Sequence, residues 1–248
     1  MTGMTQSSRS PRFVIAALIA LPFLTACSGG TSGRTQASAP PDLNGIWSAP
    51  FTPDISKPLG HQPPFTPYAA DLFKKEDEID DPLTQCLPIG PARGIQAGLM
   101  PFQIVQTPGV TAILFENQRT FRIVNTDGRS HPKDPDPTWF GDSVGHWEGD
   151  ALVVDTVATR QQIYMGELSG FFVPMSDQLH FTERIRMVNH DEMEIYFRTE
   201  DRIALAKPIE VTLHYARVTD LNRMIDENEC EDNDRDPVVN GRFITTAH

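Results

Sequence analysis

The chain of 248 residues carries 33 acidic side chains against 21 lysines and arginines, which gives a formal net charge of −12 at pH 7. A protein this acidic is repelled by phosphate backbones and by anionic membrane surfaces. The composition therefore argues against nucleic acid as a partner.

The N-terminus has the parts of a bacterial export signal. Two arginines precede an apolar run from Phe13 to Leu24, and this run is too short to span a bilayer as a helix. The residues Leu24-Thr25-Ala26-Cys27 resemble the bacterial lipobox, which implies cleavage before Cys27 and acylation of that cysteine. An ordinary cleaved signal with an incidental cysteine is the alternative. Ser28, in the place of an aspartate, resembles lipoproteins passed on to the outer membrane.

We therefore expect a signal peptide over residues 1–26, a lipidated tether over 27–41 and a single domain over 42–248. Gly, Ser, Thr, Ala and Pro dominate the tether, as is typical of flexible linkers. Loss of the signal leaves 19 basic side chains against 33 acidic ones, a charge of about −14. The expected location is the cell envelope, as an outer-membrane lipoprotein that faces the periplasm and meets the membrane only through its acyl anchor.

Once Cys27 is lipidated, Cys86 and Cys230 are the remaining cysteines. An even pair in an oxidising compartment predicts a disulfide between them. The crosslink would close a long loop, to which the chain-entropy model assigns on the order of 4–5 kcal/mol. Two buried thiols are the alternative.

One helix signal and a series of strand signals follow an irregular, proline-rich stretch over residues 48–66. Thr66 and Pro67 supply an N-cap and a first helical position, which predicts a single helix over 67–77. Residues 86–100 are expected to be irregular. Alternating apolar residues between turn signals then predict strands over 102–106, 110–116, 119–125, 144–147, 151–157, 178–188, 192–199 and 209–218.

The first strand carries a family signature. Gly45 and Trp47 form a Gly-x-Trp that resembles the start of lipocalins and other calycins, in which the tryptophan closes one end of an up-and-down barrel. Short gaps between successive strands favour antiparallel neighbours in a meander. The predicted fold is mainly β, a lipocalin-like barrel with one N-terminal helix. A two-sheet β-sandwich is the alternative.

The middle of the chain contains most of the residues that could carry chemistry. Two hairpins are predicted there, with turns at residues 126–128 and 148–150. Between them, three prolines make residues 130–137 an ordered loop without strands. At the end of this loop, we expect Trp139 and Phe140 to pack against the rest of the domain.

The same region resembles a group of bacterial secreted proteins that has no assigned activity. The resemblance spans most of the mature chain, and it implies no particular chemistry. It is carried by His131-Pro132-Lys133-Asp134-Pro135, Pro137-Thr138-Trp139, Gly145-His146-Trp147-Glu148-Gly149-Asp150 and Val153-Val154-Asp155-Thr156, with 42–47, 86–88 and 180–184.

Several catalytic classes lack their motifs in this sequence. There is no Gly-x-Ser-x-Gly elbow, no Walker loop, no GxGxxG and no His-Glu-x-x-His. The acidic stretch 226–236 has no glycine at the sixth position of a calcium-loop register, which excludes an EF-hand. We interpret that stretch as a solvated cover, with weak divalent-cation binding as the alternative. No cofactor is predicted.

Histidines on the predicted strands are the catalytic candidates. Strand alternation places His146, His180 and His214 each on one face of its strand. If the three faces lined one barrel interior, these imidazoles could hold zinc or act as acid and base beside Asp155 and Glu183. The predicted catalytic residues are therefore His146, His180, Asp155 and Glu183. Histidines that face solvent or are buried separately are the alternative.

A second set of residues is predicted to bind the ligand. Arg122 or Arg184, if it points inward, would hold a ligand carboxylate through two parallel hydrogen bonds. Aromatic walls would come from Trp139, Trp147, Phe121 and Tyr196, with His214 nearby. Structural ion pairs and ordinary core packing are the alternatives.

Two main function classes fit these residues. The favoured one is an anchored lipoprotein that binds a small apolar or aromatic molecule in its barrel, because no nucleophile or complete metal motif is legible. The alternative is a cofactor-independent or zinc-assisted lyase, isomerase or hydrolase in the same cavity. A structural protein of the envelope would need neither site.

Overall fold

The computed structural model describes most of the expected domain. The predicted signal peptide, most of the tether and the acidic stretch with Cys230 lie outside the described residues. Within the described part, no helix has the length and apolar character needed to cross a bilayer. The described residues are 39–49, 64–75, 81–96, 100–161, 175–220, 225, 238–239 and 242–243.

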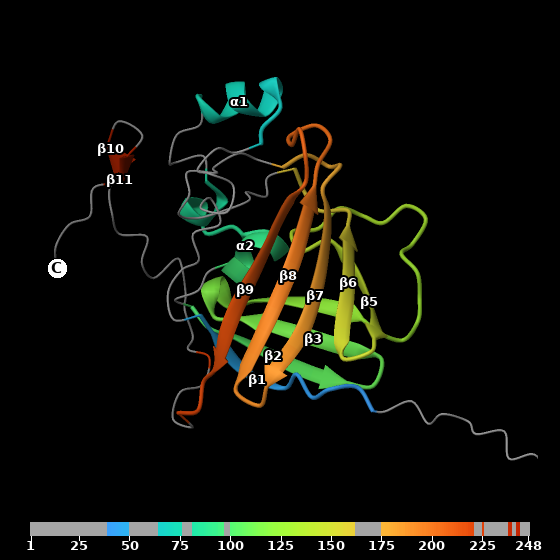
Figure 1. Ribbon diagram of the computed structural model, residues 1–248. Coiled ribbons are helices and arrows are strands. Elements are labelled where there is room, and N and C mark those ends of the chain that lie inside the picture. Colours follow the sequence, from blue (N-terminus) through green and yellow to red (C-terminus); the bar gives the residue numbers. More distant parts are fainter. Residues whose placement is uncertain are drawn as a thin grey trace, which may run out of the picture. The chain divides into compact units, whose positions relative to one another are not determined.

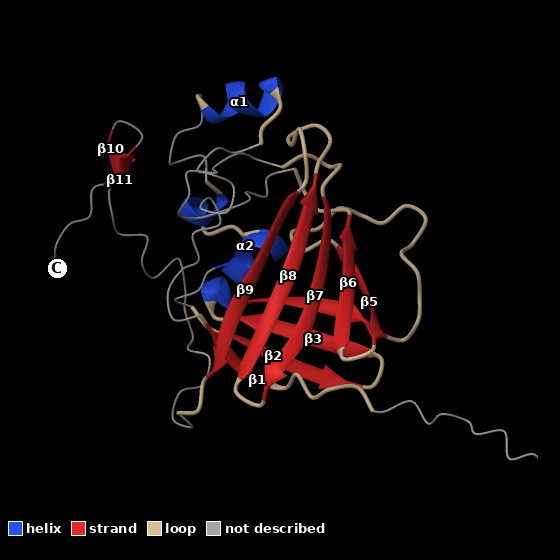
Figure 2. Cartoon of the chain, in the orientation of Figure 1, coloured by secondary structure: helices blue, strands red, loops and turns tan. Residues whose placement is uncertain are grey.

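A closed β-barrel forms the centre of this domain (Figure 1). Its strands are β1 (Gly45–Ser48), β2 (Phe102–Thr107), β3 (Val110–Phe115), β4 (Thr120–Asn125), β5 (Asp142–Glu148), β6 (Ala151–Val157), β7 (His180–Asn189), β8 (Glu192–Glu200) and β9 (Ile209–Arg217). Each strand pairs with its neighbour in the sequence, and β9 returns to β1, as Figure 2 shows. The predicted lipocalin-like barrel is thereby confirmed over the two-sheet sandwich. A separate two-stranded sheet joins β10 (Val238–Val239) and β11 (Arg242–Phe243).

One junction of the barrel departs from the predicted meander. β4 and β5 run parallel and pair only through Val124 with Ser143 and Asn125 with Val144. The hairpin predicted at residues 126–128 is therefore wrong. Its second strand would fall on residues 130–137, where three prolines lack the N–H that a ladder needs. Instead, the loop returns the chain to the level at which β5 can start beside β4 and run in the same direction. A parallel pair needs such a crossover connection.

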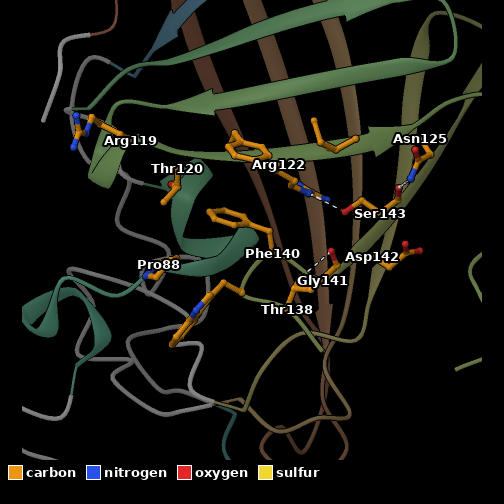
Figure 3. A pocket seen from close by; sticks show the side chains of 13 residues that line it. Pro88, Arg119, Thr120, Arg122, Asn125, Thr138, Phe140, Gly141, Asp142 and Ser143 are labelled. Carbon is orange, nitrogen blue, oxygen red and sulfur yellow. Dashed lines mark hydrogen bonds between the residues drawn. The ribbon is translucent and has the colours of Figure 1, made fainter. Parts of the chain in front are cut away.

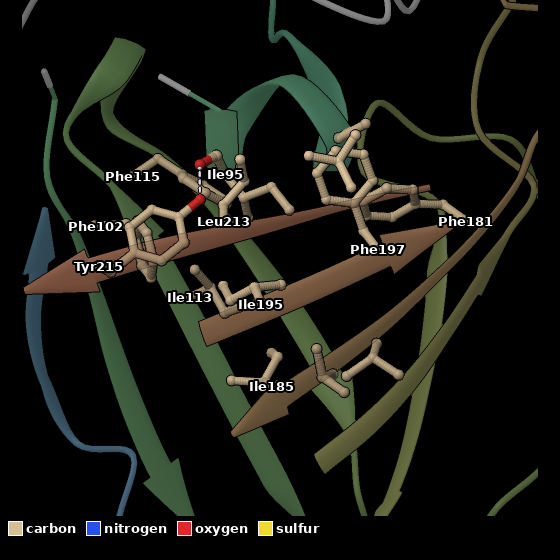
Figure 4. Close-up of a cluster of buried hydrophobic side chains, with 14 of the residues drawn as sticks. Ile95, Phe102, Ile113, Phe115, Phe181, Ile185, Ile195, Phe197, Leu213 and Tyr215 are labelled. Carbon is tan, nitrogen blue, oxygen red and sulfur yellow. Dashed lines mark hydrogen bonds between the residues drawn. The ribbon is translucent and has the colours of Figure 1, made fainter. Parts of the chain in front are cut away.

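The barrel interior is filled with apolar side chains (Figure 4). Along β7, buried Phe181, Glu183 and Ile185 alternate with the more exposed His180 and Thr182. Such alternation is the two-residue period of a strand with one face in the core. The inward rows of the other strands add Phe102, Ile113, Phe115, Ile195, Phe197, Leu213 and Tyr215.

Among the described residues, two α-helices and two short 3₁₀ turns accompany the barrel: α1 (Pro67–Phe73), α2 (Gly90–Gln96), η3 (Pro82–Gln85) and η4 (Asn117–Arg119). The predicted helix is confirmed as α1, which ends a turn earlier than expected. It begins at Thr66, whose side chain accepts a hydrogen bond from the Ala69 backbone N–H.

The helix α2 replaces part of the stretch predicted to be irregular. All seven of its residues are buried, and the carbonyl of Ile95 accepts a hydrogen bond from the Tyr215 hydroxyl (Figure 4). A Cβ on Gly94 would lie 3.0 Å from the Phe115 ring. This helix is therefore held by tertiary packing, because two glycines and a proline give it poor intrinsic propensity.

The Gly-x-Trp pair marks the closure of the barrel. The Trp47 indole N–H donates to the carbonyl of Leu43 at 3.1 Å, and the Arg217 guanidinium lies 4.3 Å above the centre of the indole ring. A Cβ on Gly45 would come within 2.2 Å of Arg217 Nη1. The flexible end of the arginine could move away from such a Cβ, so it is the φ of 148° that favours glycine at this position.

Cys86 ends η3 in the left-handed conformation, with a φ of 55°. It is disulfide-bonded. Its predicted partner, Cys230, lies outside the described residues, so the pairing of these two cysteines stays a prediction.

Candidate functional site

A pocket of about 550 Å³ opens in the barrel wall between β4 and the segment that leads into β5 (Figure 3). Its apolar lining consists of Pro88, Phe121, Ile123, Trp139 and Phe140. Its polar lining consists of Arg119, Thr120, Arg122, Asn125, Thr138, Asp142 and Ser143, with Gly141 between them. The pocket is thus mainly apolar with several polar groups in its lining, which is the usual character of small-molecule sites.

The pocket exists because the two strands beside it barely pair. β4 forms a full ladder with β3, but residues 120–123 have no ladder partner on the β5 side within the described chain. Trp139 and Phe140 occupy that side instead. The Phe140 ring stacks on Phe115 of the core at 5.4 Å between centres. Phe121 and Ile123 stay 61% and 41% exposed at the pocket, which is unusual for large apolar side chains.

The segment opposite β4 is fixed by backbone bonds to the end of β6. Thr138 N–H donates to the carbonyl of Ala158 at 3.1 Å, and Arg160 N–H donates to the carbonyl of Thr138 at 3.0 Å. The Arg160 guanidinium also lies 5.2 Å over the Trp139 ring. We call residues 138–141 the wall segment, because they form the side of the pocket that faces β4.

At the inner end of the pocket, Arg122 reaches into the barrel. Its Nε donates to Ser143 Oγ at 3.0 Å, and its Nη2 donates to Thr156 Oγ1 at 2.6 Å. Nη2 also lies 2.5 Å from Glu183 Oε2, and both side chains of this ion pair are almost completely buried. Nη1 of Arg122 has no hydrogen-bond partner among the described residues. Both oxygens of Glu183 likewise have no hydrogen-bond partner among the described residues, so unsatisfied polar atoms of both kinds lie around this buried ion pair.

A chain of histidines and carboxylates lies on the outer side of the sheet, next to the pocket. His131, in the loop before the wall segment, has Nδ1 at 2.5 Å from Asp142 Oδ1 and Nε2 at 3.0 Å from Asp155 Oδ2. The other oxygen of Asp155 lies 2.5 Å from His180 Nε2. His180 Nδ1 is 3.9 Å from Glu200. The chain therefore connects the loop to β5, β6, β7 and β8.

Ordinary surface ion pairs occupy the rest of this face. Glu148 accepts hydrogen bonds from His146 and from Arg184, the latter at 2.8 Å. Both hydrogen bonds lower the pKa of Glu148, and the one from His146 has the larger effect. The hydrogen bond from Arg198 likewise lowers the pKa of Glu200. Burial and then the nearby charge of Glu210 raise the pKa of Tyr196.

The four predicted catalytic residues do not form one site. Glu183 points into the barrel, whereas His180 and Asp155 lie on the outer face. His146 is 64% exposed and pairs with Glu148. The expected location of these histidines in the barrel interior is wrong. The inward row of β7 is the one that contains Phe181 and Ile185, so His180 must face outward.

Three of the predicted ligand-binding residues, Phe121, Arg122 and Trp139, line the pocket. Trp147 packs against the core from β5. Tyr196 and His214 lie on the outer rows of β8 and β9. Arg122 was expected to bind a ligand carboxylate through two hydrogen bonds. In the structure, the carboxylate beside Arg122 is that of Glu183.

No convergence of three imidazoles is seen. His146, His180 and His214 all lie on outer rows, but they are on different strands, and none of them is the cross-strand partner of another. Across the described ranges, no group of three or more His, Cys, Asp and Glu side chains is arranged to hold a metal ion.

The sequence analysis missed the role of His131 and Asp142. His131 was quoted only as part of a motif, and Asp142 precedes the predicted strand. The three prolines near His131 were a usable signal, because an ordered loop needs a polar group to fix it to the sheet.

No family model, curated protein or solved structure matches this chain. The candidate site is therefore argued from its own geometry, and membership in the uncharacterised secreted group stays a proposal.

Proposed function

We propose that this protein binds a small, mainly apolar or aromatic molecule in the wall pocket between β4 and the wall segment. The observation that carries the proposal is a pocket of about 550 Å³ with apolar walls and a buried arginine in its lining. Its volume lies in the range of small-molecule sites, roughly 300–1,000 Å³. The pocket that the described residues form lies in the barrel wall, so the wall is the proposed site.

The ligand is expected to carry one hydrogen-bond acceptor. Arg122 has three of its contacts satisfied by Ser143, Thr156 and Glu183, while Nη1 lacks a partner in the described part of the chain. Because Glu183 balances the charge, a neutral acceptor such as a carbonyl or hydroxyl oxygen fits better than a second carboxylate. Trp139 and Phe140 would contact the flat apolar part of the ligand.

Binding can be tested with N-phenyl-1-naphthylamine, a neutral aromatic probe whose fluorescence rises in apolar surroundings. The purified protein should bind it saturably. Ile123→Trp fills the pocket and should weaken probe binding by at least about tenfold, since it removes the apolar contact area of the site. Val105→Trp is the matched control, because Val105 is similarly exposed, at 37%, on β2 and does not line the pocket. Equal affinity in both variants would refute the pocket as the site.

We further propose that the protein acts at the outer membrane, facing the periplasm, through acyl-Cys27. The lipobox-like sequence ahead of Cys27 supports this proposal. Cys27→Ser should release the protein from the membrane fraction, because one residue carries the anchor. A variant that stays bound to membranes after a high-salt wash would contradict it.

Acid–base catalysis is the second candidate function. The contact of 2.5 Å between His180 Nε2 and Asp155 Oδ1 favours it, because a histidine beside a carboxylate is a common arrangement for general acid–base catalysis. An enzyme would return its ligand chemically changed, which mass spectrometry of the bound molecule before and after incubation detects. His180→Gln should stop that change, and an unchanged ligand in the wild type would leave binding as the function.

A further inference from the structure

We propose that protonated His131 is a latch that holds the wall segment in place beside β4, so that ligand affinity falls when this histidine loses its proton. His131 stands in the loop between β4 and β5, and both of its ring nitrogens contact carboxylates. The inference rests on the proposed binding function for its effect on affinity. The latch itself rests only on the geometry of the loop.

A count of protons supports the latch. Three contacts join the two imidazoles to carboxylates: His131 to Asp142, His131 to Asp155, and His180 to Asp155. Each needs one hydrogen between its two atoms. Two neutral imidazoles supply only two N–H groups, and ionised carboxylates supply none. The chain is therefore complete only with one additional proton. Because an imidazole is more basic than a carboxylate, this proton resides on His131 and makes it a donor through both nitrogens.

The groups around His131 are predominantly acidic. β5 presents Asp142, β6 presents Asp155, and β7 presents His180, behind which Glu200 stands on β8. Within the loop, Arg129 forms an ion pair with Asp127. The hydrogen bond to Asp127 is the main reason why the pKa of Arg129 is raised, and the charge of Asp142 adds a smaller contribution. The His131 ring is only 20% exposed. A positive charge on this ring is therefore balanced by two carboxylates at contact distance.

Loss of the proton would break one of the two contacts. A neutral His131 would direct a nitrogen lone pair at either Asp142 or Asp155, and the two acceptors would repel each other. The loop would then be attached to one strand in place of two. Because the same loop ends in Thr138 and Trp139 of the wall segment, loosening at His131 reaches the pocket.

The direction of the pH effect follows from which state of the loop holds the additional proton. The loop keeps both contacts of His131 only with that proton, so it is fully attached on the acidic side of the test range and loses one attachment as the pH rises. We expect a loss of about tenfold, the usual contribution of one charge-assisted hydrogen bond.

The test compares the full-length mature protein at about pH 5.5 and about pH 8.5, which bracket the usual titration of histidine. Amide hydrogen exchange of Thr138 and Arg160, corrected for intrinsic rates, reports the wall segment directly. The protection factors should fall about tenfold on the alkaline side in the wild type. Affinity for N-phenyl-1-naphthylamine, which has no group that titrates in this range, should fall in parallel.

Two variants separate the latch from general pH effects. His131→Gln should show low protection at both pH values, because an amide can donate to only one of the two carboxylates at a time. His146→Gln is the control: it removes an exposed histidine that contacts Glu148 and not the loop, and it should keep the wild-type pH dependence. Nitrogen chemical shifts of the His131 ring in the wild type provide a second measurement should His131→Gln not fold.

Each result has a defined meaning. Protection that is unchanged with pH, or a fall that persists in His131→Gln, would overturn the latch. A His131 ring that keeps the same protonation state over the range in which protection falls would also overturn it. Protection that falls as expected while the probe binds at neither pH would support the latch and refute the proposed binding function.

Discussion

Arg122 and Glu183 face each other inside the barrel, with 2.5 Å between Nη2 and Oε2 and relative exposures of 1% and 0%. The arginine comes from β4, beside the weakly paired junction, and the glutamate comes from β7. Ser143 and Thr156 supply hydrogen-bond partners from β5 and β6. A charged pair of this kind is costly to bury, and its energetic role depends on both partners being present.

We expect single substitutions of this pair to be far more harmful than the double one. Arg122→Met or Glu183→Leu alone should lower the free energy of unfolding by about 3–5 kcal/mol, because each leaves a buried charge without its partner. The double variant should regain most of that loss, since two apolar side chains fit the surrounding core. Urea unfolding of the four proteins measures the difference. Additive losses in the double variant would show that the two charges act independently.

Gly141 should be required for the wall segment. Its φ is 69°, and a Cβ there would lie 2.4 Å from the carbonyl oxygen of Val157. Gly141→Ala therefore combines backbone strain with a steric clash and should cost about 2–4 kcal/mol, with weaker probe binding. Gly128→Ala is the control, because its φ is also positive, at 84°, but nothing lies within 4 Å of an added Cβ. It should cost only about 1 kcal/mol, and equal losses of unfolding free energy would show that the clash is relieved by movement.

Tyr215 should make the protein sensitive to alkali. Burial, and then the charge of Glu183, raise the pKa of its hydroxyl well above the ordinary value. Because the folded-state pKa is the higher one, the contribution of this group is complete below about pH 10 and is lost as the pH rises above the unfolded-state value.

The variant Tyr215→Phe isolates this effect. At neutral pH it should cost about 1 kcal/mol, since the hydrogen bond to the Ile95 carbonyl is lost. Urea midpoints of the two proteins should converge as the pH rises from about 8 to about 11, because the wild type alone has Tyr215 to ionise on unfolding. A constant gap would mean that Tyr215 ionises as readily in the folded protein as in the unfolded chain.

The disulfide of Cys86 gives a fourth prediction. Thiol titration of the denatured, unreduced mature protein should find no free cysteine, since Cys230 is the expected partner. Reduction should lower the free energy of unfolding by up to about 4–5 kcal/mol, the value for a long closed loop. Two reactive thiols would contradict the pairing.

The strands were predictable because turn residues and apolar alternation are local signals. The inward row could also have been deduced, since Phe181 and Ile185 assign Glu183 to the core and His180 to the outside. The helix α2 was not predictable in this way, because burial stabilises it and its own residues disfavour helix.

The contacts of His131 with Asp142 and Asp155 could not be obtained from sequence spacing. They depend on the parallel passage of β5 beside β4, which the turn residues at 126–128 do not indicate. The same parallel junction produces the pocket, so one unpredicted strand direction accounts for both the pocket and the contacts of His131.

The pairing of β1 with β9 has a consequence for the order in which the protein folds. Trp47 pairs with Arg217, so the first strand of the barrel bonds to the last. During synthesis β1 leaves the ribosome long before its second neighbour exists, and β2 itself follows only after a long intervening stretch. The hairpins from β2 to β3 and from β5 to β9 have local contacts and can form early, whereas closure over Trp47 must wait for the end of the chain. Until then the indole and the edge of β9 stay unprotected, and a chain truncated within β9 would leave an open sheet that is prone to aggregate.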